Sequence, residues 1–122
     1  MRRLEVKLNY ETADSLDFLE SRLLALKSLI YDHQKWLPKD KFAANNNFFK
    51  TVYQLFKILE ENEKLKFQKE KPPLGIFRKI ETIKKTIQEE QFLAEREWLK
   101  IKIKDLKLEI GANTGSFSKN IN

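Results

Sequence analysis

Cysteine is absent from this chain of 122 residues, and glycine and proline are scarce, with three of each. Without cysteine there is no disulfide, no thiol nucleophile and no thiolate metal site. The few glycines and prolines argue against a β-sandwich or barrel, because such folds depend on many tight turns. A chain without cysteine suits a reducing compartment, so we expect the protein in the cytoplasm.

Long apolar runs are also missing. The sequence has no stretch of about 18 consecutive apolar residues, so it predicts no transmembrane helix and no membrane partner. The first ten residues, MRRLEVKLNY, contain two arginines with no long apolar segment behind them. We therefore expect no signal peptide.

Histidine occurs once, as His33, so no second imidazole or thiol can complete a zinc-type site with it. The adjacent acidic pairs Glu60/Glu61 and Glu89/Glu90 diverge on a helix and cannot jointly hold a metal ion. A glycine-rich phosphate loop is missing as well. The sequence therefore predicts no catalytic residue, no metal site and no cofactor, and we expect a protein that is not an enzyme.

Positive charge is in excess in this chain, because 24 Lys and Arg residues outnumber 18 Asp and Glu residues and give a net charge of +6. Residues 1–63 hold ten basic and ten acidic residues, whereas residues 64–122 hold fourteen basic and eight acidic residues. The whole excess thus lies in the second half. This pattern indicates an acidic partner such as nucleic acid, an anionic surface or an acidic protein. The alternative is a solvated surface that binds nothing.

Length and composition predict a single helical domain over residues 1–122. Apolar residues recur at steps of three and four, which predicts helices over residues 14–36, 47–65, 74–89 and 94–118. Their apolar stripes are Leu16, Leu19, Leu23, Leu26 and Ile30; Phe48, Val52, Leu55 and Leu59; Ile76, Ile80, Ile83 and Ile87; and Leu99, Ile103, Leu106 and Ile110. We expect the phenylalanines of the second helix in the core rather than stacked on bases, because aromatic side chains bury large areas.

Local signals set the expected helix ends. Asp14 can cap the first helix, and Asn45–Asn47 can cap the second. Pro73 suits the first turn of the third helix. The apolar stripe slips out of register after the third helix, which predicts a turn near Glu89–Ala94.

Two segments fit more than one structure. Residues 3–10 alternate apolar and polar positions, and we interpret residues 1–12 as an extended N-terminal arm or a frayed helix start. Residues 98–110 also alternate over part of their length and could pair with the arm in a small sheet. Because Lys, Leu and Glu are good helix formers, we favour a helix for residues 98–110.

Basic residues gather on the third and fourth predicted helices. Lys100, Lys104 and Lys107 step by four and three, so they share one face beside the fourth apolar stripe. Point charges on such a face can neutralise phosphates without reading sequence. The candidate nucleic-acid-binding residues are Lys39, Lys41, Arg78, Lys79, Lys84, Lys85, Lys100, Lys104 and Lys107. The alternative is a solvated face that nearby glutamates partly balance.

Gly111 and Gly115 lie one helical turn apart near the end of the chain. Small residues at this spacing form a notch that lets another backbone approach closely. Gly111 alone could equally end a helix. Together with Phe117, the two glycines are the candidate helix-packing or oligomer residues.

This terminal segment resembles the ending of accessory variability determinant (Avd) proteins of diversity-generating retroelements, which tend to end in E-I-G-x-x-x-G-G-W-x-K. The matching residues are Glu109, Ile110, Gly111, Gly115, Ser116, Phe117 and Lys119, with Ser116 in place of a glycine and Phe117 in place of the tryptophan. Upstream, the resemblance rests on Leu37, Pro38, Lys39, Lys41 and Phe42 in the first connection, on Ile80, Ile83, Lys84 and Ile87, and on Trp98 at the opening of the fourth helix. It covers about residues 15–119 of the chain.

The resemblance implies an all-α, up-down antiparallel four-helix bundle that assembles as a ring-shaped homo-oligomer, a homopentamer. It implies a non-enzymatic accessory protein that binds a reverse transcriptase and its template RNA, or an RNA/DNA hybrid, and supports mutagenic cDNA synthesis. Lys84 is the residue that carries over onto a basic position of the family. Related proteins are encoded within intervening sequences of ribosomal RNA genes. The alternative is a small helical structural subunit of another ribonucleoprotein, similar in size and charge to a CRISPR small subunit, or a bundle that binds an acidic protein.

Overall fold

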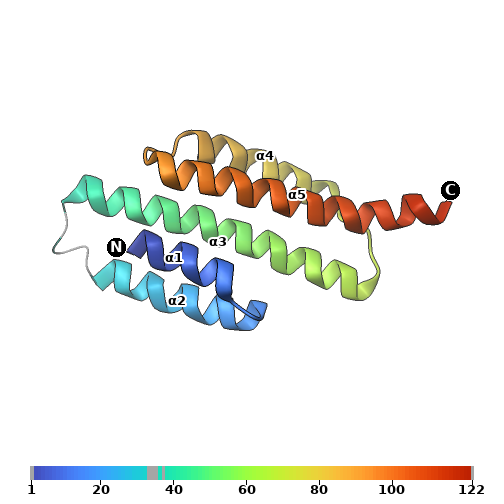
Figure 1. Ribbon diagram of the computed structural model, residues 1–122, viewed down its shortest axis with the longest axis horizontal. Helices are drawn as coiled ribbons and strands as arrows, with labels where there is room; N and C mark the ends of the chain where they lie inside the picture. Colours follow the sequence, from blue (N-terminus) through green and yellow to red (C-terminus); the bar gives the residue numbers. More distant parts are fainter. Residues whose placement is uncertain (1, 33–35, 37, 122) are drawn as a thin grey trace. The chain divides into compact units, whose positions relative to one another are not determined.

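The computed structural model describes residues 2–32, 36 and 38–121, and it describes the side chains of residues 3–32, 36 and 38–112. Over these residues the chain is all-helical and contains no strand. The helices are α1 (Arg2–Thr12), α2 (Leu16–Asp32), α3 (Lys39–Gln68), α4 (Leu74–Gln88) and α5 (Leu93–Ile121) (Figure 1). None of the described helices combines the length and the apolar content that crossing a bilayer would require.

The chain divides into two compact units, Met1–Tyr53 and Gln54–Asn122. The first unit contains α1, α2 and the first half of α3, and the second contains the rest of α3 with α4 and α5. The first unit holds nine basic and seven acidic residues and the second holds fifteen basic and eleven acidic residues, so two thirds of the net positive charge lie in the second unit.

The predicted apolar stripe of α2 forms the core of the first unit. Leu19, Leu23, Leu26 and Ile30 are buried, as the steps of three and four predicted, whereas Leu16 at the start of the helix is half-buried. Ser15 rather than Asp14 caps this helix, because its Oγ accepts a hydrogen bond from the backbone N–H of Phe18 at 3.1 Å.

Of the two interpretations of the N-terminal segment, the extended arm is wrong for residues 2–12, since Arg2–Thr12 forms helix α1. Isolated helices this short are marginal in water, so α1 depends on contacts with the rest of its unit. Val6 is buried, and the Arg3 guanidinium donates to Asn45 Oδ1 of α3 at 2.9 Å. A sheet between this segment and residues 98–110 is excluded, because both segments are helical.

Helix α3 begins eight residues before the predicted start, at Lys39. The carbonyl of Pro38 accepts the first helical hydrogen bond, from Phe42 N at 3.0 Å, so the proline precedes the helix without interrupting it. Asn45–Asn47 consequently lie inside α3 and do not cap it. Instead, the Asn45 side chain accepts the hydrogen bond from Arg3 of α1.

The three phenylalanines of α3 that lie within the predicted second helix are in the core, as predicted. Phe48, Phe49 and Phe56 are each at most 3% exposed. Burial of one such side chain stabilises a fold by about 1.5–3 kcal/mol relative to exposure. Phe67, near the end of the same helix, is 90% exposed and contributes no comparable burial.

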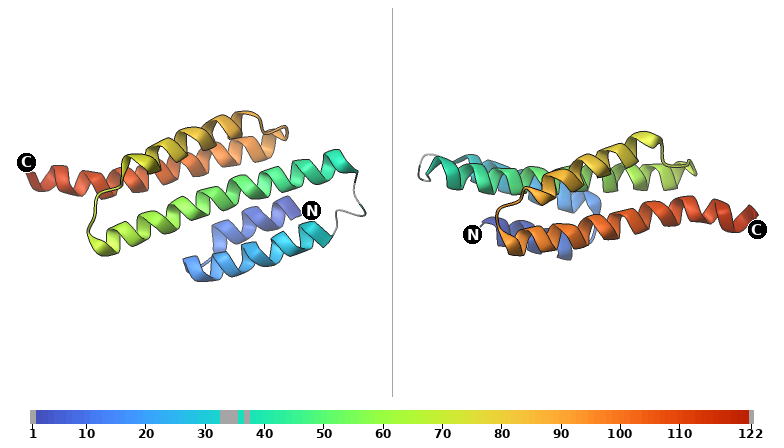
Figure 2. Two further views of the ribbon diagram at one scale, coloured as in Figure 1. Left: turned by 180° about the vertical axis from the view of Figure 1, so that it is seen from behind. Right: turned by 90° about the horizontal axis from the view of Figure 1, so that it is seen from above.

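Helices α4 and α5 run antiparallel and side by side, joined by a short turn (Figures 1 and 2). All eight predicted stripe residues on the two helices are buried. These are Ile76, Ile80, Ile83 and Ile87 of α4, and Leu99, Ile103, Leu106 and Ile110 of α5. Pro73 is the N-cap of α4, with φ −72° and ψ 160°, and so stands one position before the first turn in which it was expected.

The turn between α4 and α5 spans residues 89–92, within the predicted range, although it contains neither glycine nor proline. The Arg96 side chain holds it, because its Nε donates to the Glu90 carbonyl at 2.8 Å and its Nη2 donates to the same oxygen. The Glu90 carboxylate also accepts from Phe92 N at 3.4 Å. Side-chain hydrogen bonds thus replace the turn residues that the sequence lacks.

Candidate functional site

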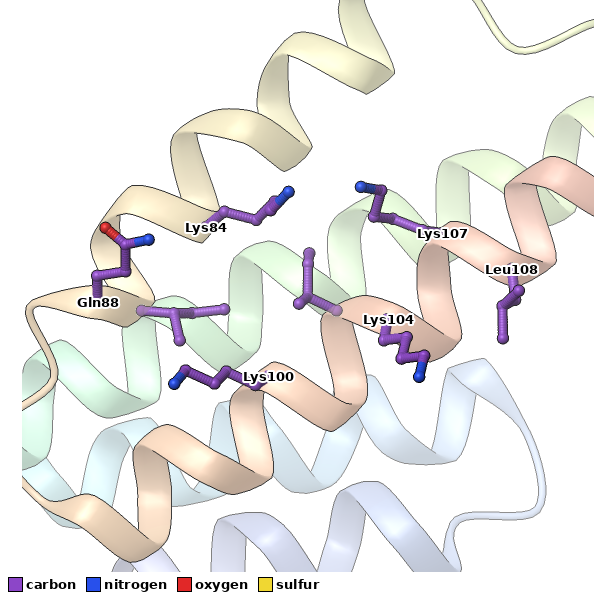
Figure 3. Close-up of a pocket in the computed structure, with 8 residues that line it drawn as sticks. Lys84, Gln88, Lys100, Lys104, Lys107 and Leu108 are labelled. Carbon is purple, nitrogen blue, oxygen red and sulfur yellow. The ribbon is translucent and has the colours of Figure 1, made fainter.

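A groove of about 500 Å³ opens along α4 and α5 in the second unit (Figure 3). Lys84 of α4 and Lys100, Lys104 and Lys107 of α5 line it. The three lysines of α5 lie on one helical face, as their spacing predicted, and the antiparallel pairing with α4 adds the fourth.

The four lysine side chains extend differently (Figure 3). The amines of Lys84 and Lys107 point toward each other from the two helices. Lys100 extends along the groove toward the end of α4 that carries Gln88, whereas the amine of Lys104 turns to the outer side of α5. Two cations therefore face one another across the groove, which is an arrangement that a bound anion stabilises.

The rest of the lining is largely apolar. Ile87 and Ile103 are nearly fully buried and form the floor of the groove, whereas Leu108 is 64% exposed at its edge. Gln88 supplies an amide that can both donate and accept hydrogen bonds. The groove consequently combines an apolar floor with a cationic rim.

Two of the groove lysines have acidic neighbours on their own helix. Lys84 Nζ lies 3.7 Å from Glu81 Oε1, and Lys100 Nζ lies 3.4 Å from Glu97 Oε1. All four side chains are more than a third exposed, so water screens both pairs and their contribution to stability is small. Either lysine can exchange its carboxylate for a ligand phosphate at little cost.

Lys104 and Lys107 form no ion pair with any carboxylate in the part of the chain that the structure describes. No acidic side chain is among the described residues that line the groove. Low-dielectric walls lined by one sign of charge concentrate the electrostatic field and attract counter-ions. The groove is therefore suited to an anion, and its lysines to phosphate groups in particular.

The other predicted basic residues do not line this groove. Lys39 and Lys41 lie in the first turn of α3, in the other unit, and are exposed. Arg78 and Lys85 are exposed on α4. Lys79 is engaged across helices, since its Nζ lies 3.2 Å from Glu61 Oε2 of α3.

The predicted packing residues lie near the end of α5. Gly111 is exposed, and a Cβ built on it would meet nothing within 4 Å. It does not end the helix, and among the described residues no backbone outside α5 approaches it closely. Gly115 and Phe117 belong to the portion of α5 whose side chains lie outside the described residues, and His33 also lies outside them.

The apolar lining and Gln88 were not predicted as part of the site. The spacing could have indicated Gln88 and Leu108, because Gln88 follows Lys84 by four residues and Leu108 follows Lys104 by four. Residues four apart on a helix lie on the same face. Ile87 and Ile103 were assigned to the core stripe alone, although a residue at the edge of a stripe can also form the floor of a surface groove.

Within the described ranges, no group of three His, Asp or Glu side chains is placed to hold a metal ion. Comparisons with protein-family models, with curated proteins and with solved structures find no match to this chain. Functional assignment therefore rests on the residues of the groove and on the sequence motifs.

Proposed function

We propose that the groove along α4 and α5 binds RNA, and that the protein is a non-enzymatic accessory factor of a reverse transcriptase. The observation that supports RNA binding is that Lys84, Lys100, Lys104 and Lys107 line one groove without an acidic residue in its described lining. Phosphate neutralisation by point charges is the sequence-independent component of nucleic-acid affinity. Lys84, which corresponds to a basic position of the Avd proteins that the sequence resembles, is one of these four lysines.

The resemblance to Avd proteins supplies the rest of the proposal. In it, α2 to α5 form an up-down four-helix bundle, and several copies assemble in the cytoplasm as a ring, a homopentamer. The ring binds the reverse transcriptase of a diversity-generating retroelement together with its template RNA and supports mutagenic cDNA synthesis. The all-helical structure of the described residues and the turn between α4 and α5 are compatible with this bundle. A reverse-transcriptase gene and a repeated template beside the gene would support the assignment.

Removal of the groove charges tests the RNA site. We expect the triple variant Lys84→Gln/Lys104→Gln/Lys107→Gln to bind a labelled RNA at least about tenfold more weakly in fluorescence anisotropy. The slope of log affinity against log salt concentration should fall by about two, because each phosphate contact with a single strand contributes about 0.7.

The matched control is Lys39→Gln/Lys41→Gln/Lys85→Gln, which removes the same charge from exposed positions outside the groove. Equal weakening by both triple variants would show that net charge, and not the groove, binds RNA. If the wild-type protein binds no RNA but retains an acidic protein, the alternative function as an acidic-protein-binding bundle is correct.

A further inference from the structure

We infer that the groove accepts unpaired RNA, with a base seated on the exposed apolar part of its lining and the flanking phosphates held by lysines on both sides. This inference rests on the proposed RNA-binding function and specifies the form of RNA that is bound. The feature that points to it is the chemistry of the lining, which is apolar between the charges.

The apolar part of the lining distinguishes a single strand from a duplex. It consists of Leu108, which is 64% exposed at the edge, and of the aliphatic stems of the lysines, because Ile87 and Ile103 beneath them are nearly fully buried. A double helix keeps its base faces stacked inside and presents phosphates and 2′-hydroxyls on a rigid convex surface. A single strand exposes base faces, which can cover this apolar surface and displace water from it.

The lysines lie where the phosphates on either side of a seated base would be. Lys84 and Lys107 face one another from opposite helices (Figure 3). Lys100 and Lys107 are seven residues apart on α5, which is about 10 Å along the helix axis. A strand that follows α5 can therefore contact cations before and after the floor.

The size of the groove matches this ligand. A volume of about 500 Å³ falls within the range of small-ligand pockets, so a nucleotide fits inside the groove, whereas a double helix can only lie across its opening. Gln88, at the end toward which Lys100 extends, can hydrogen-bond the edge of a base through its amide. The groove thus offers Gln88 to the base and the lysines to the phosphates of the RNA backbone.

Competition experiments with wild-type protein test the form of RNA directly. A fluorescein-labelled 12-nucleotide RNA is displaced by the same unlabelled strand, by its duplex and by a strand with abasic central positions. We expect the single strand to bind about tenfold tighter than either competitor at equal phosphate concentration, because a seated base removes its own apolar face and that of the lining from water. Equal affinity of the intact and abasic strands, or of the single strand and the duplex, would overturn the inference.

A pair of variants tests the groove itself. We expect Leu108→Ser to weaken single-strand binding several-fold and to leave duplex binding unchanged, because it removes apolar surface and no charge. Ile101→Ser is the control, since Ile101 is 56% exposed on the same helix but does not line the groove. Circular dichroism of both variants checks that the helices are intact.

The outcomes separate the two proposals. Lysine-dependent RNA binding that is indifferent to bases and to Leu108→Ser contradicts the seated base and leaves the proposed function standing. Absence of binding to every RNA contradicts the proposed function and the inference together.

Discussion

Lys69 ends α3 with a backbone conformation that lysine rarely adopts. Its φ is 58°, in the left-handed region. Glu70 N donates to Leu65 O at 2.8 Å, and Lys69 N donates to Lys66 O at 3.1 Å. These two bonds define a Schellman motif, whose left-handed position usually holds glycine. The sequence therefore places a strained residue at the last turn of its longest helix.

Replacement of this residue by glycine should stabilise the protein. We expect Lys69→Gly to raise the free energy of unfolding by about 1 kcal/mol, because glycine adopts the left-handed conformation without steric cost. Urea denaturation followed by circular dichroism measures the change. Lys64→Gly, at an exposed interior position of α3, should lower stability by about 1 kcal/mol. A loss of stability in both variants would contradict the role of Lys69 in the cap.

At the scale of the element, α5 serves two purposes with two faces. Its apolar stripe packs into the core, and the neighbouring face carries the lysines of the groove. Lys102 does not lie on this face, and its side chain is only 14% exposed. Its amine lies 5.8 Å from the centroid of the Trp98 ring and 3.7 Å from Asp105 Oδ2. The position of a lysine around the helix therefore decides whether it reaches the groove.

The α4–α5 hairpin depends on Arg96. We expect Arg96→Ala to lower the free energy of unfolding by about 1–3 kcal/mol, because it removes both hydrogen bonds to the Glu90 carbonyl. Chemical denaturation measures the loss, and Arg96→Lys should show an intermediate one. Arg78→Ala removes an exposed arginine from α4 and should change stability by less than about 0.5 kcal/mol. Similar denaturation curves for all variants would mean that the turn forms without this side chain.

At the scale of the whole molecule, the proposed assembly would increase the number of basic grooves available to one RNA. A ring of copies would multiply the basic groove, so that one RNA contacts several grooves at once. Each chain contributes 14.6 kDa and a net charge of +6. The proposed ring therefore predicts a particle several times heavier than one chain, whereas a mass of 14.6 kDa in light scattering favours the alternative small-subunit function.

Gly111 connects helix stability with assembly. Because nothing lies within 4 Å of a Cβ built there, Gly111→Ala should stabilise the isolated helix by about 0.5–1 kcal/mol. If the notch receives another copy, the same change should reduce the particle mass in light scattering. Glu109→Ala, at another exposed position of α5, should leave the mass unchanged. An intact ring in Gly111→Ala would remove this residue from the interface.

The sequence by itself determined the helical class and the four apolar stripes, because helix periodicity is a local property that each segment carries alone. It also located the turn after α4 through the change of register, and it placed three groove lysines on one face of α5. Only the tertiary structure decided that residues 2–12 are a helix, that α3 starts at Lys39 and that Lys84 joins the α5 lysines over an apolar floor. These features depend on contacts between residues far apart in the chain, such as Arg3 with Asn45, and on the pairing of α4 with α5. No periodicity within one segment contains that information.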